Sequence, residues 1–114
     1  MATMRVSFHG NEDYVYLDDT TIKNLEIFAS SYESTEKYSL FGVINNTQTG
    51  GGGRLLRTVL QHPLRSLEQI TYRQEMISHF QKDIQASRHI HHTLGMVIDI
   101  PRIVSLIVYR KTLP

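Results

Sequence analysis

Three groups of residues have types and spacings that could carry chemistry, and the first is a run of four glycines at residues 50–53. Backbone amides clustered at the start of a helix favour an anion, so a phosphate-binding loop is one hypothesis. A Walker loop, however, needs Lys and then Ser or Thr after its last glycine, where this chain has Arg54 and Leu55. We therefore expect the glycines to form a flexible bend.

The second group is a histidine cluster, His89, His91 and His92, whose first and last members share one helix face. Metal sites need three or four ligands with supporting hydrogen bonds, and the nearby carboxylates are Asp83 and Asp99. We expect these histidines to be solvated surface side chains. A small metal-binding domain is the competing hypothesis, which elemental analysis would test.

The third group is a polar stripe formed by Arg54, Arg57 and, one turn later, Gln61. Such a stripe could contact phosphates, or its arginines could be solvated or pair with acidic groups elsewhere. A free-standing helical nucleic-acid-binding module would add Arg65 and Arg73 to the two arginines of the stripe. Aromatic residues are not interleaved with these basic residues, which weakens the case for direct DNA contact.

The composition limits what 114 residues can do. The length suits one domain and excludes a multi-domain enzyme. The chain has no Cys, which excludes disulfides and thiol catalysis. No Ser is placed on a sharp strand-to-helix turn or paired with a catalytic base. We therefore expect neither a catalytic site nor a bound cofactor or metal. With 40% hydrophobic residues and no run of 18 apolar ones, we expect a cytoplasmic protein without membrane association.

The net charge of +1 conceals an asymmetry along the chain. Residues 1–36 contain two basic and seven acidic residues, whereas residues 37–114 contain ten basic and four acidic ones. The two parts could attract each other, or the second could present a basic face to a partner. Composition leaves both interpretations open.

The elements that must position these side chains begin with a predicted β-hairpin. Residues 6–8 and 14–17 are β-favouring runs separated by a polar segment. Asp18 is then expected to cap a short helix by accepting a hydrogen bond near Thr21, and Asn24 to bond to the backbone of a neighbouring segment. Residues 29–38 lack an apolar period and indicate a surface loop.

Residues 39–114 are predicted to form a helical core. Ser39 is suited to cap a brief helix, and after the glycines a longer helix has one apolar face and ends at Pro63. Ser66 with Gln69 forms a capping box for the longest helix of the chain. The apolar face of the helix after the glycines comprises Leu55, Leu56, Val59 and Leu60.

One further helix is predicted from Ile84 to Leu94, where Gly95 ends it, and the last helix is predicted to begin after Asp99. The final helix is apolar on most sides, and such a helix is normally buried on most sides. We therefore expect the chain to be a piece of a larger protein, and the isolated piece to self-associate through this helix. The apolar residues are Ile103, Val104, Leu106, Ile107, Val108 and Leu113.

Three segments share their order and spacing with a known family. They contain Leu17, Asp18, Thr21, Asn24, Leu25 and Glu26, then Phe41, Thr49, Gly52, Arg54, Leu56, Leu60 and Pro63, and finally Asp99. Over residues 14–110 the chain resembles the core domain, domain III, of the MutS family of DNA mismatch-repair proteins. Four successive glycines, and Val59 where a larger aromatic is common, depart from the family pattern.

The resemblance implies a parent protein that binds mismatched DNA, hydrolyses ATP with Mg and forms a homodimer. It also implies that the mismatch-reading domain, the lever helices, the DNA clamp and the ATPase lie outside this chain. The partners of the chain would then be the remaining domains of the parent, with DNA reached through them. A branch of the family that acts on recombination intermediates stays open, and a Phe-x-Glu wedge upstream would separate the two.

Together these observations predict a mainly α fold, a small helical core fragment with a short N-terminal β-hairpin. Residues 1–38 would hold the hairpin, a short helix and a loop, and residues 39–114 the helical core, all within a single fragment. The resemblance implies a structural and allosteric role, in which nucleotide state at one end and DNA engagement at the other bias each other.

Overall fold

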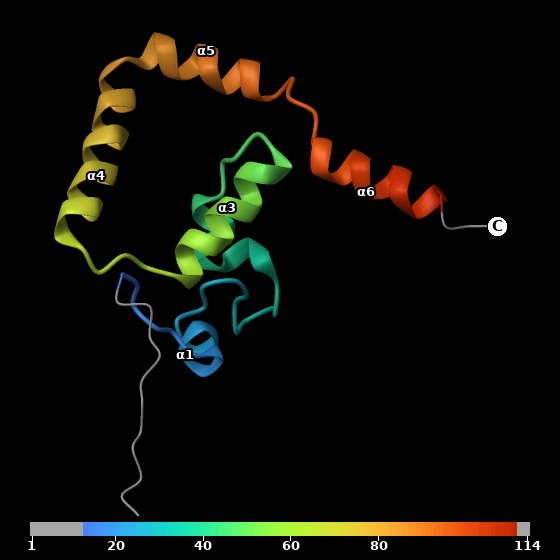
Figure 1. The fold of residues 1–114 in the computed structure, drawn as a ribbon. Coiled ribbons are helices and arrows are strands. Elements are labelled where there is room, and N and C mark those ends of the chain that lie inside the picture. Colours follow the sequence, from blue (N-terminus) through green and yellow to red (C-terminus); the bar gives the residue numbers. More distant parts are fainter. Residues whose placement is uncertain (1–12, 112–114) are drawn as a thin grey trace, which may run out of the picture.

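Six α-helices and one short 3₁₀-helix follow one another in the computed structural model, which describes residues 13–111 (Figure 1). The mainly helical prediction is therefore confirmed. In chain order the elements are α1 (Asp19–Asn24), η1 (Glu36–Tyr38), α2 (Leu40–Ile44), α3 (Gly50–Gln61), α4 (Leu67–Lys82), α5 (Ile84–Leu94) and α6 (Ile100–Lys111). None of the helices in the described part is long and apolar enough to cross a membrane.

The predicted N-terminal β-hairpin is not seen in the described residues. Within residues 13–111 the extended backbone near Tyr14 forms an isolated antiparallel bridge, and its partner is Leu64, far away in the sequence. The first run of the predicted hairpin, residues 6–8, lies outside the described residues. The β-favouring pattern of residues 14–17 correctly indicated an extended segment, but the partner is not a sequence neighbour.

Pro63 creates the partner for this segment. It ends α3 at His62, because a proline disfavours helical geometry in the residue before it. The residues that follow Pro63 are extended. The Val15 amide donates to the Pro63 carbonyl at 2.7 Å, and the Arg65 amide donates to the Asp13 carbonyl at 3.0 Å. The start of the described chain is thus tied to the end of α3.

The predicted helix starts are confirmed by their caps. Each capping side chain accepts a hydrogen bond from the amide three residues later, which satisfies a donor that the helix leaves free. The bonds run from Thr21 to Asp18 at 2.6 Å, from Gly42 to Ser39 at 3.1 Å, from Gln69 to Ser66 at 3.4 Å and from Arg102 to Asp99 at 3.4 Å.

The glycine run does not form the predicted bend. All four glycines belong to the first turn of α3, because Thr49 caps the helix and accepts from the Gly52 amide at 2.9 Å. No glycine of the described residues has a positive φ. The cap offsets part of the entropic cost of helical glycine, about 1 kcal/mol per residue relative to Ala.

A small core lies where the segment after α1 folds back onto α2. Ile27 is 4% exposed and Phe41 2% exposed, and the Phe41 amide donates to the Ile27 carbonyl at 2.8 Å. The hydroxyl of fully buried Ser39 donates to the Glu36 carbonyl at 2.6 Å while it caps α2. This core holds α1, η1 and α2 together beside α3.

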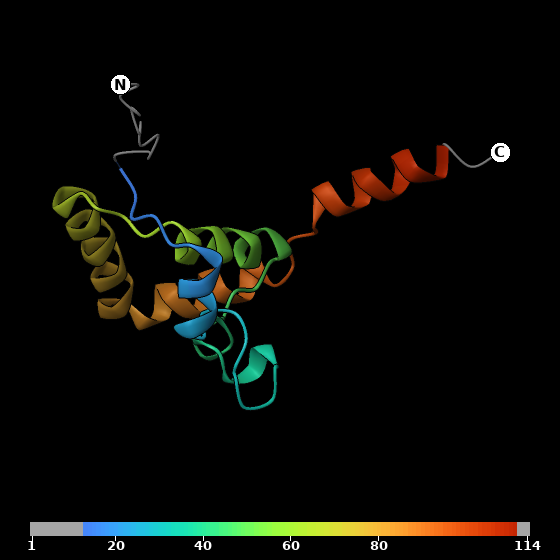
Figure 2. The same cartoon turned by 90° about the horizontal axis from the view of Figure 1, so that it is seen from below.

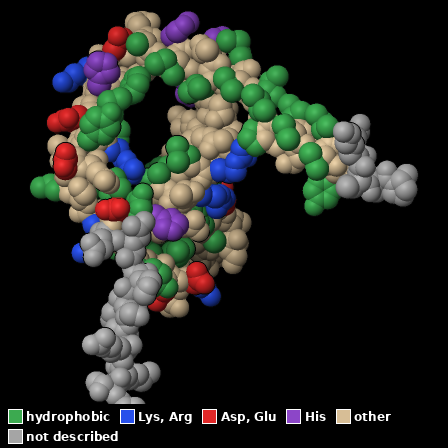
Figure 3. All heavy atoms as spheres, viewed as in Figure 1, with side chains coloured by type: hydrophobic (Ala, Val, Ile, Leu, Met, Phe, Trp, Pro, Cys, Tyr) green, Lys and Arg blue, Asp and Glu red, His purple; other side chains and the backbone are tan. Residues whose placement is uncertain are grey.

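The chain is open beyond α3. Helices α4 and α5 follow one another around an opening that remains visible when all atoms are drawn, and α6 extends away from the other helices (Figures 1, 2 and 3). The radius of gyration is 19.3 Å, compared with about 13 Å for a compact domain of 100 residues. Hydrophobic side chains of these helices, including Phe80, Ile90 and Ile107, therefore lie at the surface.

Candidate functional site

The candidate site is built on α3, where Arg54 and Arg57 lie three residues apart. Neither guanidinium group is free. Each pairs with a carboxylate from another part of the chain, and together they connect α3 to the segment before it and to the helix at the end of the described chain. We call this arrangement the α3 junction.

The first half of the junction is a bidentate ion pair between Arg54 and Asp99. The Arg54 Nη1 and Nη2 atoms donate to Asp99 Oδ2 and Oδ1, both at 3.0 Å, across 45 residues of sequence. Two parallel hydrogen bonds fix the relative orientation of both groups as well as their distance. The Arg54 hydrogen bonds lower the pKa of Asp99, and the pairing raises the pKa of Arg54.

Gly50 lies where this ion pair closes. A Cβ atom at Gly50 would lie 2.2 Å from Asp99 Oδ2, so the Asp99 carboxylate would have to move from its present position. At Gly51, in contrast, the nearest neighbour of a Cβ atom would be Arg54 Nη2 at 3.9 Å, which is ordinary contact. Only one of these two adjacent glycines therefore has a packing reason to lack a side chain.

The second half of the junction is Arg57, which covers the small core. Its Nη2 atom donates to Glu36 Oε2, and its guanidinium carbon lies 4.2 Å from the ring centroid of Phe41 and 5.2 Å from that of Phe28. A planar guanidinium group can cover an aromatic face while its edge donates to a carboxylate. Arg57 therefore belongs to the packed side of α3.

This packing corrects the predicted facing of α3. Leu55 was assigned to the apolar face but is 64% exposed, whereas Arg57, assigned to the polar face, is half-buried. The other predicted inward residues, Leu56, Val59 and Leu60, are half-buried. Relative to the prediction, α3 is rotated so that Arg57 faces inward, because the Phe28 and Phe41 rings and the Glu36 carboxylate contact this part of the helix.

The Arg57–Glu36 pair joins the acidic first part of the chain to its basic second part. It favours the interpretation that the two parts attract each other. Both arginines proposed to contact DNA are therefore already paired, Arg57 with Glu36 and Arg54 with Asp99. Arg65 and Arg73 are exposed. A nucleic-acid-binding module that uses all four arginines would have to break both ion pairs.

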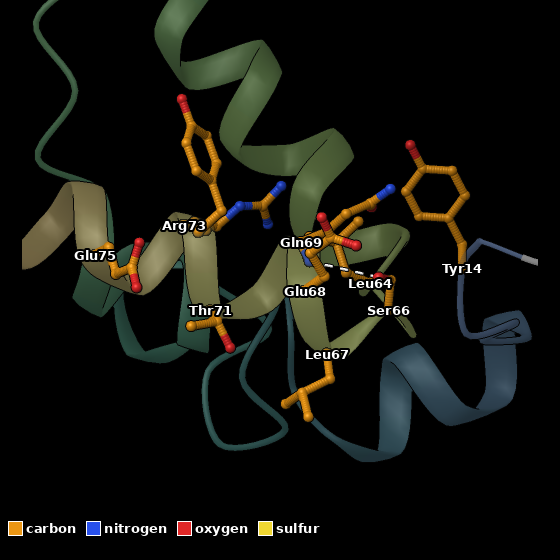
Figure 4. A pocket seen from close by; sticks show the side chains of 10 residues that line it. Tyr14, Leu64, Ser66, Leu67, Glu68, Gln69, Thr71, Arg73 and Glu75 are labelled. Atoms are coloured by element: carbon orange, nitrogen blue, oxygen red, sulfur yellow. Dashed lines mark hydrogen bonds between the residues drawn. The ribbon is translucent and has the colours of Figure 1, made fainter.

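Arg73 borders an open cavity of about 990 Å³ between α4 and the segment before α1. Figure 4 shows side chains of α4, among them Leu67 and Glu75, with Tyr14 on the opposite side. The lining combines apolar, acidic and basic side chains without a charge excess that would define a ligand. The cavity is a gap left by the open arrangement of α4.

The histidine cluster is exposed on α5, at His89, His91 and His92. Among residues 13–111 no three His, Asp or Glu side chains lie close enough together to hold a metal ion. The metal-binding hypothesis therefore finds no geometric support in the described part of the chain.

Comparison with known proteins identifies the family. The model of MutS domain III matches residues 20–114. The chain belongs to the MutS domain III family. Over 107 residues it is 38% identical to the DNA mismatch repair protein MutS of Treponema denticola, covering 94% of this chain and 12% of that protein. No solved structure matches the chain significantly.

Two further relatives are also named DNA mismatch repair protein MutS. The chain is 37% identical to the protein of Dehalococcoides mccartyi over 110 residues, which covers 96% of the chain and 13% of the relative. It is 30% identical to the protein of Borreliella burgdorferi over 107 residues, which covers 94% of the chain and 12% of the relative. The chain thus spans about an eighth of the length of these MutS relatives.

The structure brings only some of the family-pattern residues of this MutS domain III segment to the junction. Thr49, Gly52 and Arg54 lie at the start of α3, where Arg54 meets Asp99 and Thr49 caps the helix. Leu25 is 60% exposed. Pro63 and Leu17 lie apart from the ion pairs, at the end of α3 and before α1, and Leu60 is half-buried near the end of α3.

The prediction for Asn24 is wrong. Its side chain is exposed at the last residue of α1 and makes no hydrogen bond to another described residue. Glu26, two residues later, has φ of 52° and accepts from the Ser31 amide at 2.8 Å. Glu26 therefore makes the contact with a neighbouring segment that was expected of Asn24.

Sequence reasoning missed several residues on which the junction depends: Phe28, Glu36, Gly42 and Gly50. Glu36 lies 21 residues before its partner Arg57, a separation without helical or strand periodicity. The excess of acidic residues in the first part of the chain was the one available signal for this pairing. Nothing in the glycine run distinguished Gly50 from the three glycines that follow it.

Three carboxyl groups whose hydrogen bonds lower their pKa predict how stability depends on pH. Hydrogen bonds from Thr21 to Asp18, from Ser31 to Glu26 and from Arg54 to Asp99 lower each pKa below the ordinary values of 3.8 for Asp and 4.5 for Glu. The unfolded chain therefore binds more protons in acid, so the free energy of unfolding should be constant above about pH 5 and fall below it. Urea unfolding followed by circular dichroism between pH 7 and pH 3 measures this.

Asp99→Asn is the matched variant for this experiment. Asn keeps the cap of α6 but cannot lose a charge, so the variant should be less stable at pH 7 and should lose less stability on acidification. An identical acid-induced loss in both proteins would show that the Arg54–Asp99 pair makes no contribution to folding.

Proposed function

We propose that this chain is a structural and allosteric core segment of a MutS-like DNA mismatch-repair protein, linking its DNA-binding and ATP-hydrolysing parts. The observation that supports the link is the α3 junction. One helix holds Glu36 and the Phe41 ring through Arg57 and the start of α6 through Arg54. A displacement of α6 would therefore act on α3, and α3 would transmit it to the core around α2.

The chemistry of the junction suits transmission. Ion pairs with fixed geometry and an arginine stacked on aromatic rings resist small displacements and separate only as units, which gives discrete arrangements. Allosteric coupling between two sites is typically worth about 1–3 kcal/mol, a range that a few such contacts can supply. The described part of the chain thus has the contacts that a coupling element needs.

The residues present do not fit ATP, although the parent is proposed to bind it with Mg. The Gly52 and Gly53 amides of the glycine turn are already bonded to Thr49, and the nearest guanidinium group, Arg54, is held by Asp99. No Lys with a following Ser or Thr is available at this turn. We assign ATP hydrolysis and DNA contact to the remaining domains of the parent.

The test uses the full-length parent with Arg57→Lys, which keeps the charge but removes the planar group that stacks on Phe41. We expect the stimulation of ATP hydrolysis by mismatched DNA to fall by about fivefold, while hydrolysis without DNA is unchanged. Arg65→Lys is the matched control, since Arg65 is exposed. Unchanged stimulation in the Arg57 variant would contradict the proposal.

A separate experiment tests the alternative of a free-standing nucleic-acid-binding module that uses Arg54, Arg57, Arg65 and Arg73. The 114-residue chain would then bind DNA by itself, with an affinity that falls steeply with salt. We expect no such binding, because carboxylates already neutralise two of the four arginines. Salt-dependent binding by the isolated chain would favour the module.

A further inference from the structure

We propose that the Arg54–Asp99 pair, closed against the Cα atom of Gly50, is a releasable latch that sets the direction in which α6 leaves the other helices. The latch deepens the proposed function, and rests on it for its use in the parent. Its existence can be tested on the chain alone, without DNA or nucleotide.

The segment between α5 and α6 is built like a hinge. Its backbone hydrogen bonds are local: the Met96 amide donates to Thr93, the Val97 amide to Leu94 and the Ile100 amide to Ile98, at 2.9–3.1 Å. The side chains of Met96, Val97 and Ile98 are more than half exposed, with Val97 at 52%. Local bonds of this kind leave the direction of the next helix free to change.

Packing does not fix the direction of α6 either. The helix extends away from α3 and α5 in both ribbon views (Figures 1 and 2), and within residues 13–111 it has no extensive packing on another helix. Its hydrophobic side chains are 42% exposed at Ile103 and 59% at Leu106. A specific contact at its first turn can therefore control where it points.

Asp99 makes that contact with two groups at once. Its carboxylate accepts two hydrogen bonds from Arg54 and also caps α6 through the Arg102 amide at 3.4 Å. The start of α6 is thereby tied to the first turn of α3. The close approach at Gly50, where a Cβ atom would lie 2.2 Å from Oδ2, lets the carboxylate reach Arg54 in this position.

The latch is releasable because it is open to water. The Arg54 side chain is 57% exposed and that of Asp99 21% exposed. Solvent and salt compete with an ion pair at such a surface, so the closed and open states should be populated within about tenfold of each other. A modest pull on α6, or a partner that binds it, is then enough to change the balance.

The experiment measures a distance across the latch. The chain contains no Cys, so Gln61→Cys on α3 and Ser105→Cys on α6 provide two unique sites for spin labels, and pulsed electron resonance gives the distribution of distances between them. We expect a major closed population and a minor open one. Raising the salt concentration should increase the open population about threefold or more.

Gly50→Ala and Gly51→Ala form the decisive pair. Both substitutions favour helix by the same intrinsic amount, but only the first places a methyl group against Asp99. Gly50→Ala should increase the open population with unchanged helical circular dichroism, and Gly51→Ala should match the parent chain. Asp99→Asn, which keeps the cap, should also open the latch.

Equal distance distributions in the Gly50 and Gly51 variants, or a distribution insensitive to salt, would overturn the latch. If the latch opens as expected but Arg57→Lys leaves DNA-stimulated ATP hydrolysis unchanged in the full-length parent, the proposed function fails while the latch stands. If the Arg57 variant loses stimulation and the Gly50 variant shows no opening, the junction couples without the latch.

Discussion

Phe41→Ala is expected to destabilise the core around α2 by about 3–5 kcal/mol, the usual loss for truncating a buried aromatic. Phe41 is 2% exposed, and Arg57 and Phe28 both pack on its ring. The variant therefore leaves a cavity and removes the aromatic surface that holds Arg57. Urea unfolding and hydrogen exchange of the Phe41 amide, which is bonded to Ile27, measure the loss.

Leu55→Ala is the control for this prediction. Leu55 has a similar apolar side chain but is 64% exposed, so its truncation should cost less than about 1 kcal/mol. Leu56→Ala and Leu60→Ala should fall between the two, because both side chains are half-buried. If Leu55→Ala destabilised the chain more than Phe41→Ala, α3 would pack in the orientation that the aliphatic pattern predicted.

Local chemistry explains which parts of the fold could be predicted. Asp18, Ser39 and Ser66 each precede a helix and accept from an amide three residues away, so the signal and the contact lie within one turn. Pro63 acts on the residue before it, and the longest helix was predicted at α4. Such interactions need no knowledge of the rest of the chain.

The elements that could not be predicted depend on contacts between distant residues. The extended segment at Tyr14 was recognisable, but its pairing with Leu64 depends on where α3 ends in space. The glycine run was expected to bend because intrinsic propensity disfavours helix, and the Thr49 cap and the approach of Asp99 to Gly50 outweigh that preference. Propensity alone is a weak prior when tertiary contacts compete with it.

The candidate site shows the same division between local and distant contacts. Spacing correctly placed Arg54 and Arg57 near each other on one helix, which suggested a phosphate-binding stripe. Their partners, Asp99 and Glu36, lie 45 and 21 residues away, and no periodicity connects such positions. A charged pair at helical spacing is therefore compatible with a ligand site and with an internal junction, and only the three-dimensional contacts separate them.

Gly42→Ala is expected to destabilise the same region by about 2 kcal/mol or more, although Ala favours helix over Gly. A Cβ atom at Gly42 would lie 2.0 Å from the Glu36 carbonyl oxygen and 2.9 Å from that of Lys37, so the backbone of η1 has to move. Because η1 carries the Glu36 side chain that binds Arg57, its displacement should also weaken the α3 junction.

Gly51→Ala gives this prediction its sharpest comparison. It is also a helical glycine, but its methyl group would make only an ordinary contact with Arg54 Nη2 at 3.9 Å, so it should stabilise the chain by about 0.5–1 kcal/mol. Opposite signs for the two substitutions, measured by urea unfolding, would show that the cost at Gly42 comes from packing against η1. If Gly42→Ala were also stabilising, η1 would not pack against α2 as described, and Arg57 would need another anchor.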